Sequence, residues 1–110
     1  MRFGTYTGLL LLGLSTVSTP QPAHAADRGH ELFREKGCVQ CHVYDGEGGS
    51  KGPALDGVGK RLSKTAIENQ IRNGSLVMPA FAEALTADEI TAIAAFLHKS
   101  TKPSTALHSR

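Results

Sequence analysis

Two cysteines and a histidine stand together in the stretch Cys38-Val39-Gln40-Cys41-His42, and the chain of 110 residues has no other cysteine. The spacing Cys-x-x-Cys-His is the pattern through which haem c is attached to a polypeptide. Each thiol can bond one former vinyl group of the porphyrin, and a histidine that follows at once can bring its imidazole to the iron. The stretch therefore predicts one covalently bound haem c, with Cys38 and Cys41 as attachment residues and His42 as an axial iron ligand.

Three other kinds of site use paired cysteines. A redox-active Cys-x-x-Cys motif needs a βαβ context, and the residues around Cys38 do not have the pattern of strands. A structural zinc site needs four ligands, whereas this stretch offers three. A disulfide between cysteines this close closes a very short loop and stabilises a fold little. Haem attachment is therefore the interpretation that the residues of this stretch favour.

The chain begins with the pattern of a secretory signal peptide. Arg2 supplies an early positive charge, a leucine-rich run covers residues 9–14, and Ala23-His24-Ala25 offers the small residues of a cleavage site. The apolar run is shorter than the ~20 residues that a membrane-spanning helix needs. We therefore expect cleavage after Ala25, export to the periplasm or another compartment outside the cytoplasm, and no stable membrane insertion afterwards.

This cleavage divides the chain into a signal peptide over residues 1–25, one domain over residues 26–100, and a polar tail over residues 101–110. A domain this small often needs a cofactor, a metal or a disulfide to complete its core. The formal net charge of the whole chain is +2, and the loss of Arg2 lowers it to +1. This charge is too small to indicate nucleic acid or an anionic membrane as a partner.

The domain carries helix signals and no convincing strand. One helix is expected over residues 26–37, with Asp27 as its N-cap and Gly37 as its left-handed end. The many glycines of residues 42–62 predict a loop, in which backbone can approach a flat ligand closely.

Two further helices have clearer ends. Ser63 is the expected N-cap of a helix over residues 63–73, and Gly74 is its expected stop. The capping box of Thr86 and Glu89 opens a final helix that runs to about Lys99. Helical spacing predicts the buried positions of these two helices, which are Ile67, Ile71, Ile90, Ile93 and Leu97.

Met78 is the expected second axial ligand of the iron. It is the methionine that remains after Met1 leaves with the signal peptide, and it lies in a loop directly before Pro79. Histidine and methionine form a common axial pair in c-type cytochromes. The alternatives are that Met78 fills a gap in the core, or that another histidine takes the second position on the iron. Those histidines are His30, His98 and His108.

The chain resembles a class I cytochrome c over residues 26–100. The resemblance is carried by Gly29, Phe33, the Cys38–His42 motif, Gly52-Pro53-x-Leu55, Met78-Pro79-Ala80-Phe81 and the final helix. It implies an all-α fold in which three to four short helices surround one covalently bound haem.

The resemblance also implies roles for particular residues. The first and last helices would cross, with Gly29 and Phe33 against residues 93–97. The carbonyl of Pro53 would accept a hydrogen bond from the outer nitrogen of His42, and Leu55 and Phe81 would pack near the haem. Many members carry a Trp that this chain lacks, which leaves the propionate contacts open, with Arg61, Lys60 and Lys64 as candidates.

The expected function is electron transfer without catalysis. A soluble monomer would pass single electrons between redox proteins that bind weakly and transiently, through a porphyrin edge near Val39 and Gln40. One alternative is an electron-accepting cytochrome subunit of a periplasmic dehydrogenase. Another is a gas-binding or peroxidatic haem protein whose distal position is open.

Overall fold

The structure is a computed structural model that describes residues 4, 8–19 and 22–103. Its elements are α1 (Pro22–Glu35), the short 3₁₀ helix η1 (Cys38–Gln40), α2 (Val58–Arg61), α3 (Lys64–Asn73) and α4 (Ala87–His98). These residues contain no strand beyond an isolated bridge between Tyr44 and Glu47. The expected all-α fold is therefore confirmed.

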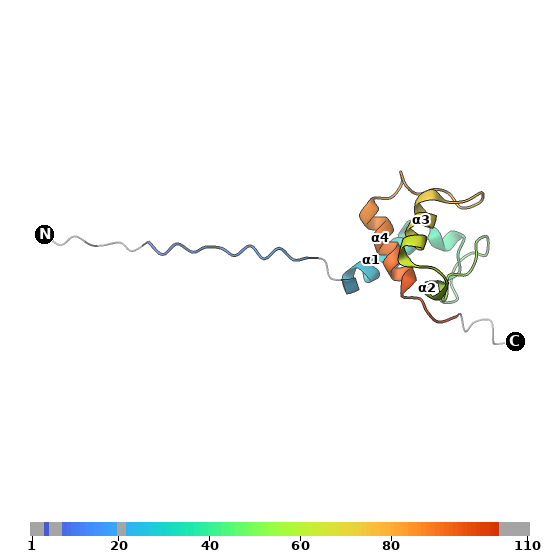
Figure 1. Ribbon diagram of the computed structural model, residues 1–110, viewed down its shortest axis with the longest axis horizontal. Helices are drawn as coiled ribbons and strands as arrows, with labels where there is room; N and C mark the ends of the chain where they lie inside the picture. Colours follow the sequence, from blue (N-terminus) through green and yellow to red (C-terminus); the bar gives the residue numbers. More distant parts are fainter. Residues whose placement is uncertain (1–3, 5–7, 20–21, 104–110) are drawn as a thin grey trace.

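Residues 8–19 have no regular structure and extend away from the helices (Figure 1). Within the part of the chain that the structure covers, no helix combines the length and the apolar character required to cross a membrane. Of the expected tail, residues 101–103 are exposed, and residues 104–110, with His108, lie outside the described residues.

The start of α1 differs from its prediction. The helix begins at Pro22 instead of after Asp27, so Asp27 lies inside it. Proline suits the first helical position because no intrahelical partner exists there for its missing N–H, and alanine, frequent in the next turn, is the strongest helix former. Cleavage after Ala25 remains a prediction, and it would leave a helix that starts close to Asp27.

The ends of α3 and α4 agree with their predictions. Ser63 Oγ accepts a hydrogen bond from the Ala66 N–H at 3.1 Å, and Gly74 caps α3 with a φ of 66°. Thr86 and Glu89 form the expected capping box. The five residues predicted to be buried are all buried, namely Ile67, Ile71, Ile90, Ile93 and Leu97.

The short helix α2 lies inside the stretch that was predicted to be a loop. Glycine weakens a helix, yet Gly59 lies within this one because α2 packs against the end of α4. The Gly59 N–H donates to the Ser100 carbonyl at 2.8 Å, and a Cβ on Gly59 would lie 2.6 Å from the His98 carbonyl carbon. Tertiary contact therefore decides this element, and its local sequence does not.

The core forms where α1 meets α4 (Figure 1). Phe33 of α1 is 1% exposed, and its ring centroid lies 5.8 Å from that of Phe96 in α4. Gly29 lies on α1 one turn before Phe33, and its missing side chain lets the backbone of α4 come close. The crossing of the first and last helices is thus as expected, and α3 packs on α4 to complete the core.

Candidate functional site

The two cysteines lie where α1 ends and the chain turns. Gly37 adopts a φ of 83°, and η1 begins directly after it at Cys38. The Cys38 carbonyl accepts hydrogen bonds from the N–H of Cys41 at 3.2 Å and of His42 at 3.0 Å. These bonds hold the three chemically active residues in one compact turn. Both cysteines are half-buried, and they form no disulfide with each other.

Burial raises the pKa of the Cys38 thiol above its ordinary value of 9.0, and the nearby Cys41 raises it further. A hydrogen bond with its own backbone opposes this effect in part. Burial of this sulfur therefore favours its uncharged form.

The imidazole of His42 is held by the segment that carries Pro53. His42 Nδ1 donates a hydrogen bond to the Pro53 carbonyl at 2.7 Å, which is the contact that the sequence resemblance implied. A hydrogen bond at one ring nitrogen sets the tautomer and leaves the other nitrogen as the metal-binding atom. His42 can therefore offer Nε2 to an iron.

Gly52 allows this approach. A Cβ at this position would lie 2.6 Å from His42 Cε1 and 2.9 Å from His42 Nδ1. The Gly52 N–H also donates to the Cys41 carbonyl at 2.7 Å. The glycine of the Gly-Pro pair thus packs directly on the imidazole, and a larger residue would displace the ring.

Met78 lies in a tight loop after α3. The Ser75 N–H donates to the Met78 carbonyl at 2.9 Å, and the Met78 N–H donates back to Ser75 Oγ at 3.2 Å. The Phe81 N–H then binds the Ile71 carbonyl at 3.0 Å and returns the chain to α3. Met78 is partly buried against the core, so its side chain points into the molecule.

Gln70 contacts the sulfur of Met78, and the sequence alone did not reveal it. Its Nε2 donates to Met78 Sδ at 3.7 Å from the last turn of α3. A polar residue on an exposed helix face is usually only solvated. The signal that could have found Gln70 is its position one turn before Gly74, because the chain that leaves a glycine stop folds back over the preceding turn.

Four of the predicted site residues pack against the same core, namely Cys38, Leu55, Met78 and Phe81. Cys41 and His42 are half-buried, and Pro53 is exposed. The competing histidines have other surroundings. His30 stacks on Phe96 with ring centroids 4.6 Å apart, and His98 is exposed at the end of α4.

The proposed propionate partners lie at α2 and at the start of α3. Lys60 and Arg61 are exposed, and Arg61 Nη1 approaches the Asp56 carbonyl at 3.4 Å. Lys64 forms an ion pair with Glu68 at 3.7 Å. Their role toward propionates remains a prediction.

These residues fit haem c. The donor set consists of two thiols in one turn, an imidazole whose Nδ1 is already bonded, and a half-buried thioether, and each is a ligand or attachment group that haem c uses. Within residues 8–19 and 22–103, no three His, Cys, Asp or Glu side chains are grouped so that they could hold a metal ion by themselves. Gly52 provides the close backbone approach that a larger residue would prevent.

Three comparisons with known proteins agree with this geometry. Residues 24–97 match the family model described as cytochrome c oxidase, cbb3-type, subunit III. The chain is 34% identical over 83 residues to cytochrome c6 of Euglena gracilis, which covers 64% of this chain and 86% of that protein. The structure of this chain is similar to the crystal structure of the c-type cytochrome SorU from Sinorhizobium meliloti. The TM-score is 0.63 and the identity 31%, over 74% of this chain and 97% of that chain.

Proposed function

Because this chain belongs to the c-type cytochromes, which carry covalently bound haem c, we propose that it transfers single electrons with His42 and Met78 as the axial ligands of the iron. Cys38 and Cys41 hold the haem through thioether bonds. The observation that carries the assignment of His42 is the hydrogen bond from its Nδ1 to the Pro53 carbonyl, because this bond leaves Nε2 for the metal.

The bound haem supplies one-electron exchange between its ferric and ferrous states. The residues of the chain keep the surroundings the same in both states. The Pro53 carbonyl orients the His42 ring, and the Ser75–Met78 hydrogen bonds hold the thioether in its loop. The buried side chains of α1 and α4 exclude water from one side of the site. Little rearrangement is then needed when an electron arrives or leaves.

The partners of such a carrier are other redox proteins, which the chain binds weakly so that release is fast. We further propose that the protein is exported, is cleaved after Ala25 and works as a monomer. The N-terminal pattern of Arg2, the leucine-rich run and Ala23-His24-Ala25 supports export. The mass of the purified periplasmic protein tests the cleavage site, because a mature chain that starts at Ala26 has a defined mass with one haem added.

A second candidate is a cytochrome subunit that stays bound to a larger redox enzyme. The family model that matches residues 24–97 is described as a subunit of an oxidase, which favours this alternative. Purification from the native source separates the two candidates, since a permanent subunit elutes with its enzyme and a carrier elutes alone.

Optical spectra of the mature holoprotein test the ligand assignment. The ferric form is expected to show a weak near-infrared charge-transfer band from sulfur ligation, and Met78→Ala is expected to abolish it. Leu76→Ala, in the same loop, is the matched control and should keep the band. If the wild type lacks the band and its ferrous form binds carbon monoxide readily, then Met78 is not a stable ligand and the gas-binding or peroxidatic alternative gains support.

A further inference from the structure

Four hydrogen bonds join residues 41–45 to residues 52–56, on both sides of His42. The paired residues are, in chain order, Cys41 with Gly52, His42 with Pro53, Val43 with Leu55, and Asp45 with Asp56. The first three bonds end on backbone carbonyls. The fourth ends on a side chain, because the Asp45 N–H donates to Asp56 Oδ1 at 2.9 Å. Asp56 therefore fastens the segment that carries His42 at its far end.

Helix capping does not account for Asp56. The residue lies directly before Gly57, the N-cap of α2, and an aspartate near a helix start usually binds the N–H groups of the first turn. No side chain caps α2. Asp56 Oδ1 instead accepts from Asp45, which lies 11 residues earlier in the chain. The side chain thus serves the loop after His42 and not its own helix.

The backbone around Asp56 is anchored to the helices. The Gly57 N–H donates to Ser100 Oγ at 2.9 Å, directly after the end of α4. Arg61 Nη1 of α2 donates to the Asp56 carbonyl at 3.4 Å, and Val58, at the start of α2, is buried in the core. The carboxylate is therefore a fixed point against which the loop after His42 can be held.

The other carboxylate oxygen, Oδ2, exposes less than 1 Å² and has no hydrogen-bond partner among the described residues. The charged residues that line the cavity beside Asp56 are Asp45, Lys99 and Lys102. A buried polar atom without a partner lowers stability, so packing alone does not favour an aspartate here. Its strong point is the bond at Oδ1, because an acceptor with a charge binds an N–H more tightly than a neutral one.

The turn that Asp56 holds is a strained one. Asp45 has a φ of 49°, in the left-handed region that residues other than glycine adopt at a cost. Reciprocal bonds between Tyr44 and Glu47 close this turn at 2.8 and 3.0 Å. The bond from the Asp45 N–H to Asp56 joins the closed turn to the base of the domain.

We propose that Asp56 is a positioning residue for His42. Its carboxylate fixes the turn after the ligand, and the fixed turn keeps the imidazole on the Pro53 carbonyl. The inference rests on the proposed function, because it concerns the residue that the function makes an iron ligand. Without this bond the loop would be held beyond His42 by the Leu55–Val43 bond alone of the four, and the two segments would separate more often.

Hydrogen exchange of the His42 Nδ1–H, followed by NMR in the ferrous holoprotein, tests this role. The proton exchanges when the two segments separate, because it is otherwise bound to the Pro53 carbonyl. Asp56→Ala should speed the exchange about tenfold or more, since it removes a hydrogen bond to a charged group. Asp56→Asn keeps an acceptor oxygen in the same place and should restore most of the protection.

Two controls separate positioning from other effects. Ser63→Ala removes the cap of α3 and lowers the stability of the whole fold, but it should leave the Nδ1–H exchange of the native state unchanged. Asp45→Asn removes a carboxylate from the same turn and keeps the N–H that binds Asp56. Asparagine tolerates a positive φ, so this variant should also exchange like the wild type.

The wild type alone provides a second test, which does not depend on the folding of any variant. One separation of the segments releases both protons, so the His42 Nδ1–H and the Asp45 N–H should show the same protection. Protection of the two that differs more than about tenfold overturns the inference. Unchanged exchange in Asp56→Ala, equal acceleration in Ser63→Ala, or no rescue by Asp56→Asn also overturns it. A wild type without the near-infrared band or without reversible one-electron reduction contradicts the proposed function instead.

Discussion

Gly29 of α1 lies directly against the carbonyl group of Ala92 in α4. A Cβ on Gly29 would be 2.6 Å from the Ala92 carbonyl carbon and 2.8 Å from Phe96 Cβ, closer than such atoms approach in proteins. The two helices that build the core therefore cross at a distance that only glycine permits at this position. Met78, Phe81 and the attachment segment pack on the same core, so this crossing also positions the candidate site.

Gly29→Ala is expected to destabilise the holoprotein by about 1–3 kcal/mol, the usual cost of overpacking a core. The direction of the change in stability is informative, because alanine is the better helix former and would stabilise an isolated helix. Urea denaturation followed by far-ultraviolet circular dichroism measures the change. Arg34→Ala, at an exposed position of the same helix, is the control and should have little effect. Higher stability for Gly29→Ala would show that the helices separate at no cost.

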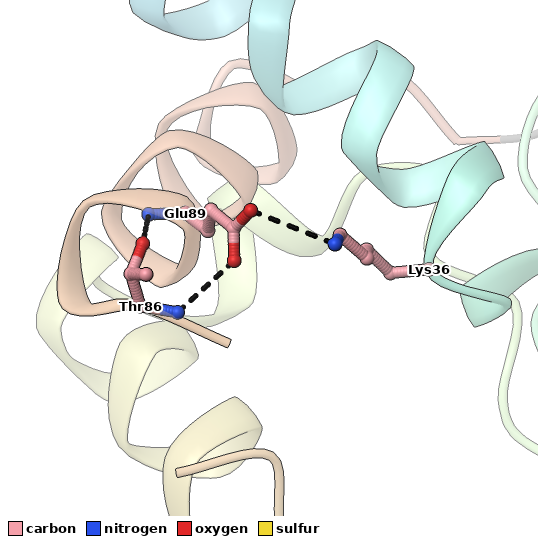
Figure 2. A network of polar contacts seen from close by, with 3 residues as sticks. All are labelled: Lys36, Thr86 and Glu89. Atoms are coloured by element: carbon pink, nitrogen blue, oxygen red, sulfur yellow. Dashed lines mark hydrogen bonds and ion pairs between the residues drawn. The ribbon is translucent and has the colours of Figure 1, made fainter. Parts of the chain in front are cut away.

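The network of Lys36, Thr86 and Glu89 ties the start of α4 to the end of α1 (Figure 2). The Thr86 N–H, which donates to the Glu89 carboxylate at 3.0 Å, lowers the pKa of this carboxyl below its ordinary value of 4.5. Slight burial opposes this effect, and the charges of Lys36 and Arg28 add to it. Since the folded-state pKa is lowered, the carboxylate stabilises the fold above pH 4.5, and this stabilisation is lost as the pH falls through the lowered pKa.

Glu89→Gln should therefore be less stable than the wild type at neutral pH, and the difference should disappear in acid. Urea titrations across this pH range give the difference directly. Thr86→Ala is the companion variant, because it removes the hydroxyl cap and keeps the backbone N–H that binds Glu89. It should lower the free energy of unfolding by about 0.5–2 kcal/mol, and its stability should still depend on pH in acid as that of the wild type does. A difference for Glu89→Gln that stays constant with pH would exclude the carboxylate charge as its cause.

Gly52→Ala is expected to disturb the site through His42. The new methyl group would overlap the imidazole, so the ring must turn and its hydrogen bond to Pro53 must weaken. Outer hydrogen bonds of a ligating histidine influence the metal, and we expect a shifted midpoint potential and a smaller haem-loaded fraction. Voltammetry and the haem-to-protein absorbance ratio measure both. Gly46→Ala separates backbone strain from contact, because Gly46 has a φ of 80° with nothing near its Cβ position. It should leave the potential unchanged.

Gln70→Leu is expected to lower the midpoint potential of the holoprotein. The amide of Gln70 donates to Met78 Sδ, and such a bond to a ligand stabilises the electron-richer reduced state. Its loss corresponds to a shift on the order of 20–60 mV, if a neutral hydrogen bond is converted for a one-electron couple. Voltammetry measures the shift. Asn69→Leu is the neighbouring control, because the Asn69 side chain accepts from Arg72 instead. An equal shift in both variants would mean that the bond to sulfur plays no part.

Features that depend on neighbours in sequence could be predicted. Ser63, Thr86 with Glu89, and Gly74 define the ends of α3 and α4 through bonds that span three or four residues. The start of α1 was predicted wrongly, because Pro22 begins the helix before any capping side chain. The helix α2 was not predicted, since its contact with Ser100 lies far along the chain.

The candidate site likewise has one part that the sequence could predict and one part that it could not. The motif Cys38–His42 is local, so its residue types and spacing already specify the chemistry that it can perform. The bond from Gln70 to Met78 depends on a loop that folds back over α3, and the exposure of Leu76 and Val77 depends on the same turn. The pattern of apolar residues in the sequence does not show in advance that Gln70 contacts the Met78 sulfur, or that Leu76 and Val77 are exposed instead of buried.

The amino-acid sequence by itself determined the chemical groups of this protein: two thiols, an imidazole and a thioether at a spacing suited to haem c, within helices whose caps are local. Which of the distant groups meet depends on the tertiary structure, although the family resemblance anticipated the contact of Pro53 with His42 and the crossing at Gly29. The tertiary structure placed Pro53 on His42, Gln70 on Met78, and Gly29 against Ala92. The physical reason is the separation along the chain between the residues that make each contact. A cap or an attachment motif acts through bonds across a few residues, whereas these contacts exist only after burial of the core brings segments 8 to 63 residues apart into van der Waals contact.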